Sequence, residues 1–125
     1  MRKFRSYQFT ASILSRLSVQ QDVAAITVGR AQAGAVYVLP IASWHEMVGR
    51  TYHAESIESA ARVNTGTAAK GGMSDSVLVD ILVNQVGEDG RIIGGTLYIV
   101  TLYGNDAAYL VPANAYWRGR VEGES

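Results

Sequence analysis

Apolar residues dominate the run from Ser76 to Tyr103, at both even and odd positions, with polar residues gathered at Glu88-Asp89-Gly90-Arg91. Short apolar runs bounded by turn signals are typical of β-strands, and Asp-Gly favours a two-residue type I′ turn. We therefore predict one long hairpin over residues 76–103 with two largely apolar faces. Gly94-Gly95 predicts a bulge in its second strand.

Two shorter apolar runs, Val23–Val28 and Ala35–Leu39, predict a second hairpin, with residues 29–34 as its loop. The turn Gly104-Asn105-Asp106 introduces another strand over residues 107–111, which Pro112 stops.

Residues 7–14 alternate between apolar and polar side chains, which favours a half-buried strand. Phe9, Ile13, Leu14 and Leu17 also have a helical spacing, so a helix is the alternative. The density of serine and threonine favours the strand.

One main helix is predicted to follow Pro40 and to extend to about Val63. Ser43 and Glu46 have the spacing of a capping box, with Ser43 as the N-cap. Gly49 costs about 1 kcal/mol relative to alanine inside a helix, so a break into two short helices is the alternative. The expected buried stripe comprises Trp44, Met47, Val48 and Tyr52, continued by Ile57, Ala60 and Ala61.

These elements predict an α+β fold in a single domain, residues 1–125, with an antiparallel sheet of about five or six strands and one main helix. Strands with two apolar faces need cover on both sides, and one helix covers one side. A second copy of the chain would cover the other, so we predict a homo-oligomer.

The amino-acid composition excludes several classes of function. Eleven acidic and eleven basic residues balance, which argues against long nucleic acids and acidic membranes as partners. The chain has no cysteine, which excludes disulfides, thiolate metal sites and a cysteine nucleophile. Residues 1–6 are basic, but no continuous apolar segment follows, so we expect neither a signal peptide nor a membrane span. A cytoplasmic protein without a cofactor is predicted.

Catalytic motifs are incomplete. Residues 66–72 form a glycine-rich loop with Lys70, but the lysine precedes the last two glycines, unlike a Walker loop. A looser anion-binding nest with Lys70 remains open. His45 and His53 are eight residues apart, whereas paired metal ligands on a helix are four apart. Either histidine with Asp80 could serve acid–base chemistry, and packing or exposure is the alternative for each.

The arginines are the best pointer to a ligand. An arginine guanidinium is a planar fork suited to phosphate, and Trp117 beside Arg118 and Arg120 combines such forks with a stacking surface. We predict an anion-binding pocket built from Trp117, Arg118 and Arg120, with Arg50 or Lys70 as further contacts. The alternative is that Trp117 packs the C-terminal segment and the arginines are solvated.

The segments Trp44–Arg50 and Tyr116–Arg120 give the chain a resemblance to phage-encoded anti-defence sponges that sequester cyclic ADP-ribose-type signalling nucleotides. The resemblance extends over the whole chain without an aligned motif, so it transfers no site residue. It implies a non-enzymatic module that holds a small phosphorylated ligand at a subunit interface, in the cytoplasm of a host cell. A structural virion or tail protein and a small enzyme with a His/Asp pocket are the alternatives.

Overall fold

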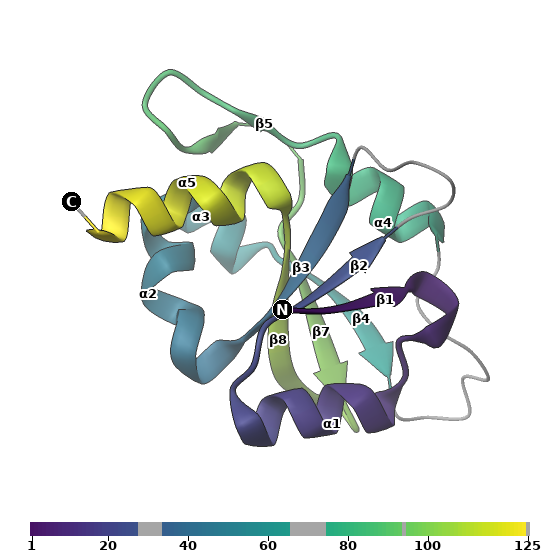
Figure 1. Cartoon of the computed structure of the whole chain (residues 1–125). Coiled ribbons are helices and arrows are strands. Elements are labelled where there is room, and N and C mark those ends of the chain that lie inside the picture. The colour runs from purple at the N-terminus through teal and green to yellow at the C-terminus, as the bar shows by residue number, and fades with distance from the viewer. Residues whose placement is uncertain (28–33, 66–74, 94, 125) are drawn as a thin grey trace.

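The computed structural model describes residues 1–27, 34–65, 75–93 and 95–124, and its centre is a six-stranded sheet (Figure 1). The elements in chain order are β1 (Arg2–Arg5), the 3-10 turn η1 (Ser6–Gln8), α1 (Ala11–Gln20), β2 (Ala24–Thr27), β3 (Ala35–Pro40), α2 (Ile41–Thr51), α3 (Ala54–Glu58), β4 (Ala61–Thr65), α4 (Asp75–Leu82), β5 (Gln85–Val86), β6 (Ile92–Ile93), β7 (Tyr98–Leu102), β8 (Asn105–Pro112) and α5 (Ala113–Glu124).

The large sheet is mixed, with strand order β1-β2-β3-β8-β7-β4, and β5 pairs with β6 in a separate two-stranded sheet. The four inner strands pair antiparallel, whereas β1 is parallel to β2 and β4 is parallel to β7. The predicted strand number is correct. The prediction of a purely antiparallel sheet is wrong at both edges, because each edge strand joins its neighbour through a helical crossover.

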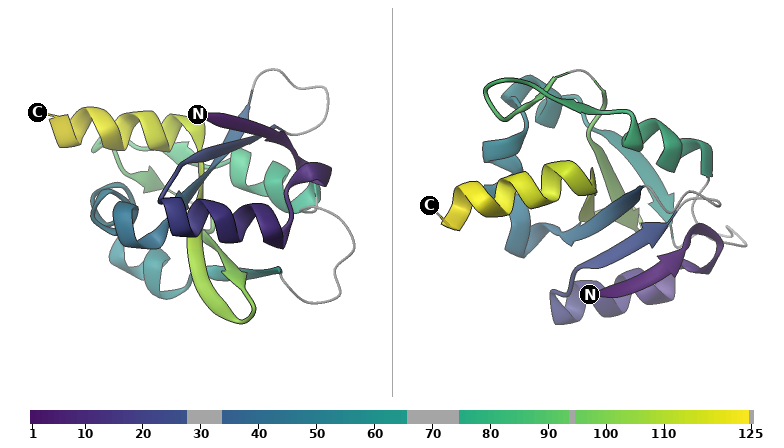
Figure 2. Two further views of the ribbon diagram at one scale, coloured as in Figure 1. Left: turned by 60° about the horizontal axis from the view of Figure 1, so that its bottom comes forward. Right: turned by 45° about the horizontal axis from the view of Figure 1, so that its top comes forward.

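Helices cover both faces of the sheet. The core on one face contains Leu14 and Leu17 of α1 with Leu78 and Ile81 of α4. The core on the other face is built on α2 and α5, which lie together on one side of the sheet (Figures 1 and 2). Val36 and Val38 face the first core, and Tyr37 and Leu39 face the second. The apolar runs of β3 and β8 therefore reflect burial on both sides.

The order of elements repeats along the chain. The first half runs β1-α1-β2-β3-α2, and the second runs β4-α4-β7-β8-α5 once α3 and the β5–β6 hairpin are set aside. Read inward from one edge of the sheet the strands are β1, β2 and β3, and from the other edge they are β4, β7 and β8. The corresponding strands β3 and β8 therefore meet at the centre. The repetition is therefore one of topology.

The predicted hairpin over residues 76–103 is wrong in its first half, because residues 75–82 form helix α4. Leu78 and Ile81 are fully buried three residues apart, whereas Val79 and Val83 are exposed. Burial of that helical stripe against the sheet outweighs the strand propensity of valine. The strand expected from the second half is present as β7.

The Asp89-Gly90 turn joins only the short strands β5 and β6. Gly90 has a φ of 84°, but Asp89 is not among the described residues with positive φ, so the turn is not type I′. A two-residue turn with positive φ at both positions occurs instead at Tyr103 (52°) and Gly104 (85°), where Leu102 pairs with Asn105. The predicted turn at Gly104 is confirmed, but Asn105 and Asp106, which were expected to belong to it, are already part of β8. Of the predicted Gly94-Gly95 bulge, residue 94 lies outside the described residues, and the irregularity in β7 falls at residues 100–101.

Residues 11–20 form helix α1, so the helical alternative for this segment is correct and the favoured strand is wrong. Phe9, Leu14 and Leu17 are almost fully buried in one core. Gln21 ends the helix in the left-handed conformation with φ of 56°.

The predicted main helix is two short helices and a strand. The first, α2, begins at Ile41 with Pro40 in the N-cap position, so Ser43 does not cap it. The Ser43 hydroxyl instead donates a hydrogen bond to Gln21 Oε1 at 2.7 Å. The break lies beyond Thr51 rather than at Gly49, and residues 61–65 form the edge strand β4. Met47, Val48 and Tyr52 are buried as predicted.

Helix α5 extends to Glu124. The glycine-rich loop predicted over residues 66–72 lies outside the described residues, as does nearly all of the loop at 29–34. Because the chain's own helices cover both sheet faces, the argument that a second copy must supply cover no longer holds. The homo-oligomer stays a prediction.

Gly119 and Gly49 provide a matched pair of tests for the contact between α2 and α5. A Cβ on Gly119 would lie 2.7 Å from Met47 Cγ and 2.8 Å from Thr51 Oγ1, and the Thr51 hydroxyl is itself held by a hydrogen bond to the Met47 carbonyl. A Cβ on Gly49 would meet no atom within 4 Å.

Both substitutions to alanine gain the same helix propensity, and only Gly119→Ala overpacks. We expect Gly49→Ala to raise the free energy of unfolding by about 0.5–1 kcal/mol. Gly119→Ala should be less stable than Gly49→Ala by about 1–3 kcal/mol. Urea denaturation measures both, and equal stabilisation of the two variants would contradict the close helix contact.

Candidate functional site

Helix α5 positions three of the predicted ligand residues. It begins directly after β8 and packs against α2, where Gly119 allows the two helices to approach closely. Tyr116 is buried beneath it, whereas Trp117, Arg118 and Arg120 are exposed. These residues were predicted to form one pocket, but the helix directs their side chains to different sides.

Four aromatic residues and one arginine gather where α5 meets α2 and β3. We call Tyr37, Trp44, Tyr116, Trp117 and Arg120 the aromatic–arginine cluster. The Trp117 indole donates a hydrogen bond from Nε1 to the Tyr37 hydroxyl at 3.1 Å. Its ring also makes edge contacts with Tyr37 and Tyr116, with ring centres 6.1 and 4.9 Å apart. Trp117 is therefore fixed in place although 51% of its surface is exposed.

Arg120 is held against the same rings. Its guanidinium carbon lies 5.7 Å from the centre of the Tyr116 ring and 5.9 Å from that of Trp117. Its Nη1 donates a hydrogen bond to the Tyr116 hydroxyl at 3.0 Å. A guanidinium attracted to ring faces and tied by a hydrogen bond is preorganised. The cluster thus offers a half-exposed indole and a positioned cation side by side.

The other predicted contacts lie elsewhere. Arg118 and Arg120 are two positions apart on α5, so they point about 160° apart around the helix. Arg50 forms an exposed ion pair with Glu46 on α2, with Nη1 and Oε1 3.2 Å apart. Its Nε is buried without a hydrogen-bond partner among the described residues. Lys70 and the rest of its glycine-rich loop lie outside the described residues.

The structure does not bring Asp80 together with either histidine. Asp80 lies on α4, over one face of the sheet, and accepts a hydrogen bond from the Tyr98 hydroxyl. That bond raises the pKa of Tyr98. His45 Nδ1 lies 2.8 Å from the Tyr109 hydroxyl, and His53 Nδ1 lies 3.1 Å from Arg91 Nη1, both on the helix α2 side. Each of the three groups already has a partner.

Buried polar groups gather beside α2. Burial raises the pKa of the Tyr52 phenol, and the nearby Asn84 amide partly offsets that rise. The Asn84 amide lies near enough to the phenol to influence its pKa, but neither the Tyr52 hydroxyl nor the Asn84 side chain makes a well-aligned hydrogen bond among the described residues. Asn84 packs against Gly95, where a Cβ would overlap its Oδ1. No group of three or more His, Asp or Glu side chains able to hold a metal is found in the described part of the chain.

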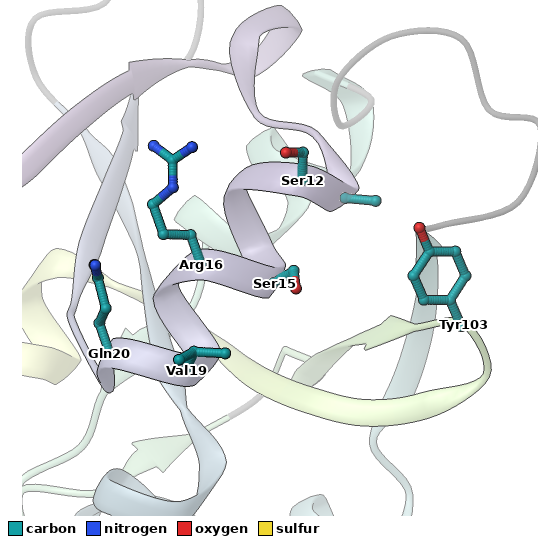
Figure 3. Close-up of a pocket in the computed structure, with 7 residues that line it drawn as sticks. Ser12, Ser15, Arg16, Val19, Gln20 and Tyr103 are labelled. Carbon is teal, nitrogen blue, oxygen red and sulfur yellow. The ribbon is translucent and has the colours of Figure 1, made fainter.

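Two open grooves that the sequence analysis missed lie on either side of Tyr103. The first, about 520 Å³, lies between α1 and the β7–β8 hairpin and is lined by Ala11, Ser12, Ser15, Arg16, Val19, Gln20 and Tyr103. The second, about 490 Å³, is lined by Ser18, Gln21, Ile41, Ala42, Leu102, Tyr103, Asn105, Asp106 and Ala107. Figure 3 shows the first groove, with Ser15 and Val19 on the side of α1 toward Tyr103. The sequence feature that could have indicated this site is Tyr103, a tyrosine at a tight turn between two apolar runs.

Asp106, in the second groove, is engaged by Arg62 of β4. Arg62 Nε and Nη2 donate to the two carboxylate oxygens at 3.2 and 2.8 Å, and Arg62 Nη1 donates to the Ala60 carbonyl. The hydrogen bonds to Arg62, and then its charge, lower the pKa of Asp106. The carboxylate therefore stays ionised and neutralised by its partner.

The chain matches no protein-family model, no curated protein and no solved structure in the three comparisons. Among the described residues, no helix is both long and apolar enough to cross a membrane.

Asp106→Asn tests the contact with Arg62 through its pH dependence. Because the folded-state pKa of Asp106 is below its ordinary value of 3.8, the contact stabilises the fold above that pH. The stabilisation is lost as pH falls through the lowered pKa. We expect wild type to be more stable than Asp106→Asn at pH 7 and the difference to shrink as pH falls below 3.8 and then through the lowered pKa of Asp106. Denaturation across this range measures it, with Asp22→Asn, an exposed carboxylate, as the control. A difference that persists in acid would contradict the assignment.

Proposed function

We propose that this chain is a non-enzymatic binding module for a small phosphorylated ligand that carries an aromatic base, such as a signalling nucleotide of an antiviral pathway. The observation that supports the proposal is the half-exposed, hydrogen-bonded indole of Trp117 beside the positioned guanidinium of Arg120. A base can stack on the indole, and the arginine fork suits the phosphate.

The Trp117 ring is held in a fixed position by its neighbours. This supports ligand binding, rather than packing, as the role of its exposed half. Tyr37 and Tyr116, which contact the indole, are 9% and 2% exposed, so the buried part of the cluster is made by them. The outer half of the indole adds no burial to the fold. An aromatic ring already fixed by its neighbours loses little conformational entropy when a ligand stacks on it.

The proposed site is formed within one chain, so it does not need a subunit interface. Arg120 and Trp117 are its proposed contacts. Arg118 is directed to another part of the α5 surface and is excluded from it. Arg50 is a further contact only if a ligand displaces Glu46, its ion-pair partner.

The test is titration of mono-, di- and cyclic nucleotides followed by Trp117 fluorescence in a Trp44→Phe background, with thermal shift as a second readout. Arg120→Ala should weaken binding about tenfold to a hundredfold, the loss typical of one charged hydrogen bond. Trp117→Ala should weaken binding similarly by thermal shift. Arg118→Ala removes the same charge from the same helix and should bind as wild type does.

Arg120→Lys keeps the charge without the fork and should fall between wild type and Arg120→Ala. The proposal fails if no nucleotide binds, or if Arg118→Ala weakens binding as much as Arg120→Ala. The second result would assign the effect to net charge.

A structural role in a virion or tail is the second candidate, and it rests on α4. Val79 lies on this helix and is 49% exposed, and Val83, which directly follows its last residue, is 64% exposed. Adjacent apolar side chains at the surface favour contact with another protein chain. Light scattering of wild type and Val83→Glu tests this role. Assembly that the substitution abolishes would favour it, and a monomeric wild type at tens of micromolar would exclude it.

A further inference from the structure

Tyr103 occupies an unusual backbone position. It is the first residue of the β7–β8 turn with φ of 52°, a region that suits glycine, asparagine and aspartate and is strained for a bulky side chain. Packing of its side chain does not offset that strain, because 68% of the surface of Tyr103 is exposed. A strained and exposed aromatic residue is a reason to look for function at this position.

The two grooves share Tyr103 as their common wall. One side of the ring adjoins the serine-rich surface of α1, and the other adjoins Asn105 and Asp106 of the hairpin. Both grooves are open and lie next to each other. An extended ligand can therefore lie along them and cross the tyrosine ring.

The two halves of the fold differ at this point. In the second half, Leu82 of α4 packs against the backbone at Gly34, where a Cβ would lie 3.2 Å from both Leu82 methyl carbons. By the spacing of the buried pairs Leu14/Leu17 and Leu78/Ile81, Ser18 holds the corresponding place on α1. Ser18 lines the second groove, and its hydroxyl has no hydrogen-bond partner among the described residues. The shorter side chain of Ser18 thus places a buried hydroxyl beside this groove, where the other half of the fold has a leucine.

The chemistry of the lining selects the ligand class. Serine hydroxyls and the amides of Gln20, Gln21 and Asn105 both donate and accept hydrogen bonds. Asp106 of the second groove is neutralised by Arg62, and Arg16 of the first groove leaves one positive charge among the described lining residues. In Figure 3, Arg16 extends from α1 on the side away from Tyr103. A lining with one cation and many neutral hydrogen-bonding groups favours an uncharged polar ligand over a phosphate.

We propose that the two grooves form a binding site for a neutral carbohydrate chain, with Tyr103 as its stacking platform. A sugar ring has an apolar C–H face that packs on an aromatic ring. Its hydroxyls, which donate and accept, match the serine and amide side chains along both grooves. The site is separate from the aromatic–arginine cluster and does not depend on it.

The experiment is an NMR titration of ¹⁵N-labelled protein with neutral hexasaccharides of glucose, N-acetylglucosamine, mannose or galactose. With at least one of them, we expect saturable shifts of backbone amides in residues 11–21 and 102–107. Tyr103→Asn keeps a residue suited to the turn and removes the ring, so it should weaken binding about tenfold or more. Ser15→Leu fills the first groove and should act in the same direction.

Tyr7→Ala is the matched control, because Tyr7 is also 68% exposed and lines neither groove. It should bind as wild type does, and Tyr103→Phe should retain most of the affinity. The inference is overturned if no hexasaccharide shifts these amides at about 5 mM, a concentration that detects millimolar affinity. It is also overturned if Tyr103→Asn binds normally, or if ATP shifts these amides and the sugars do not. None of these results bears on binding at Trp117 and Arg120.

Discussion

The pairing of β3 with β8 is the constraint on which the rest of the structure depends. The two strands join the two topologically similar halves, and both are buried on both faces. A pair buried on both sides requires a layer of helices above and below it. The chain supplies α1 and α4 for one layer and α2 and α5 for the other. The helices in turn determine which surfaces remain for ligands.

The close contact of α5 with α2 links this constraint to the aromatic–arginine cluster. Gly119 lets the helices approach until Tyr116 is buried between them, and the next residue, Trp117, is then held at the surface by Tyr37 of β3. The proposed site is therefore preorganised by the same packing that stabilises the second core, and its ligand would meet a rigid surface.

The two proposed sites differ in a physically consistent way. The cluster on α5 joins a cation to an indole, whereas the grooves beside Tyr103 join neutral hydrogen-bonding groups to a phenol ring. Each uses an exposed aromatic ring that the fold does not need for its core. The positioned cation beside the indole favours a phosphate at the first site, whereas neutral hydrogen-bonding groups outnumber the one cation among the described lining residues, Arg16, at the second.

The sequence by itself placed the strands β2, β3, β7 and β8 and a turn at Gly104, because short apolar runs ended by glycine or proline favour strands. It also identified Trp117 and Arg120 as ligand candidates. It could not decide between strand and helix for residues 11–20 and 75–82, where leucines three apart stand among serines or valines that also fit a strand. Only burial against the sheet selects the helix there. Helical geometry directs Arg118 and Arg120 to different sides of α5. Long-range packing brings Tyr103 next to α1. These are contacts between residues distant in the chain, which local patterns do not encode.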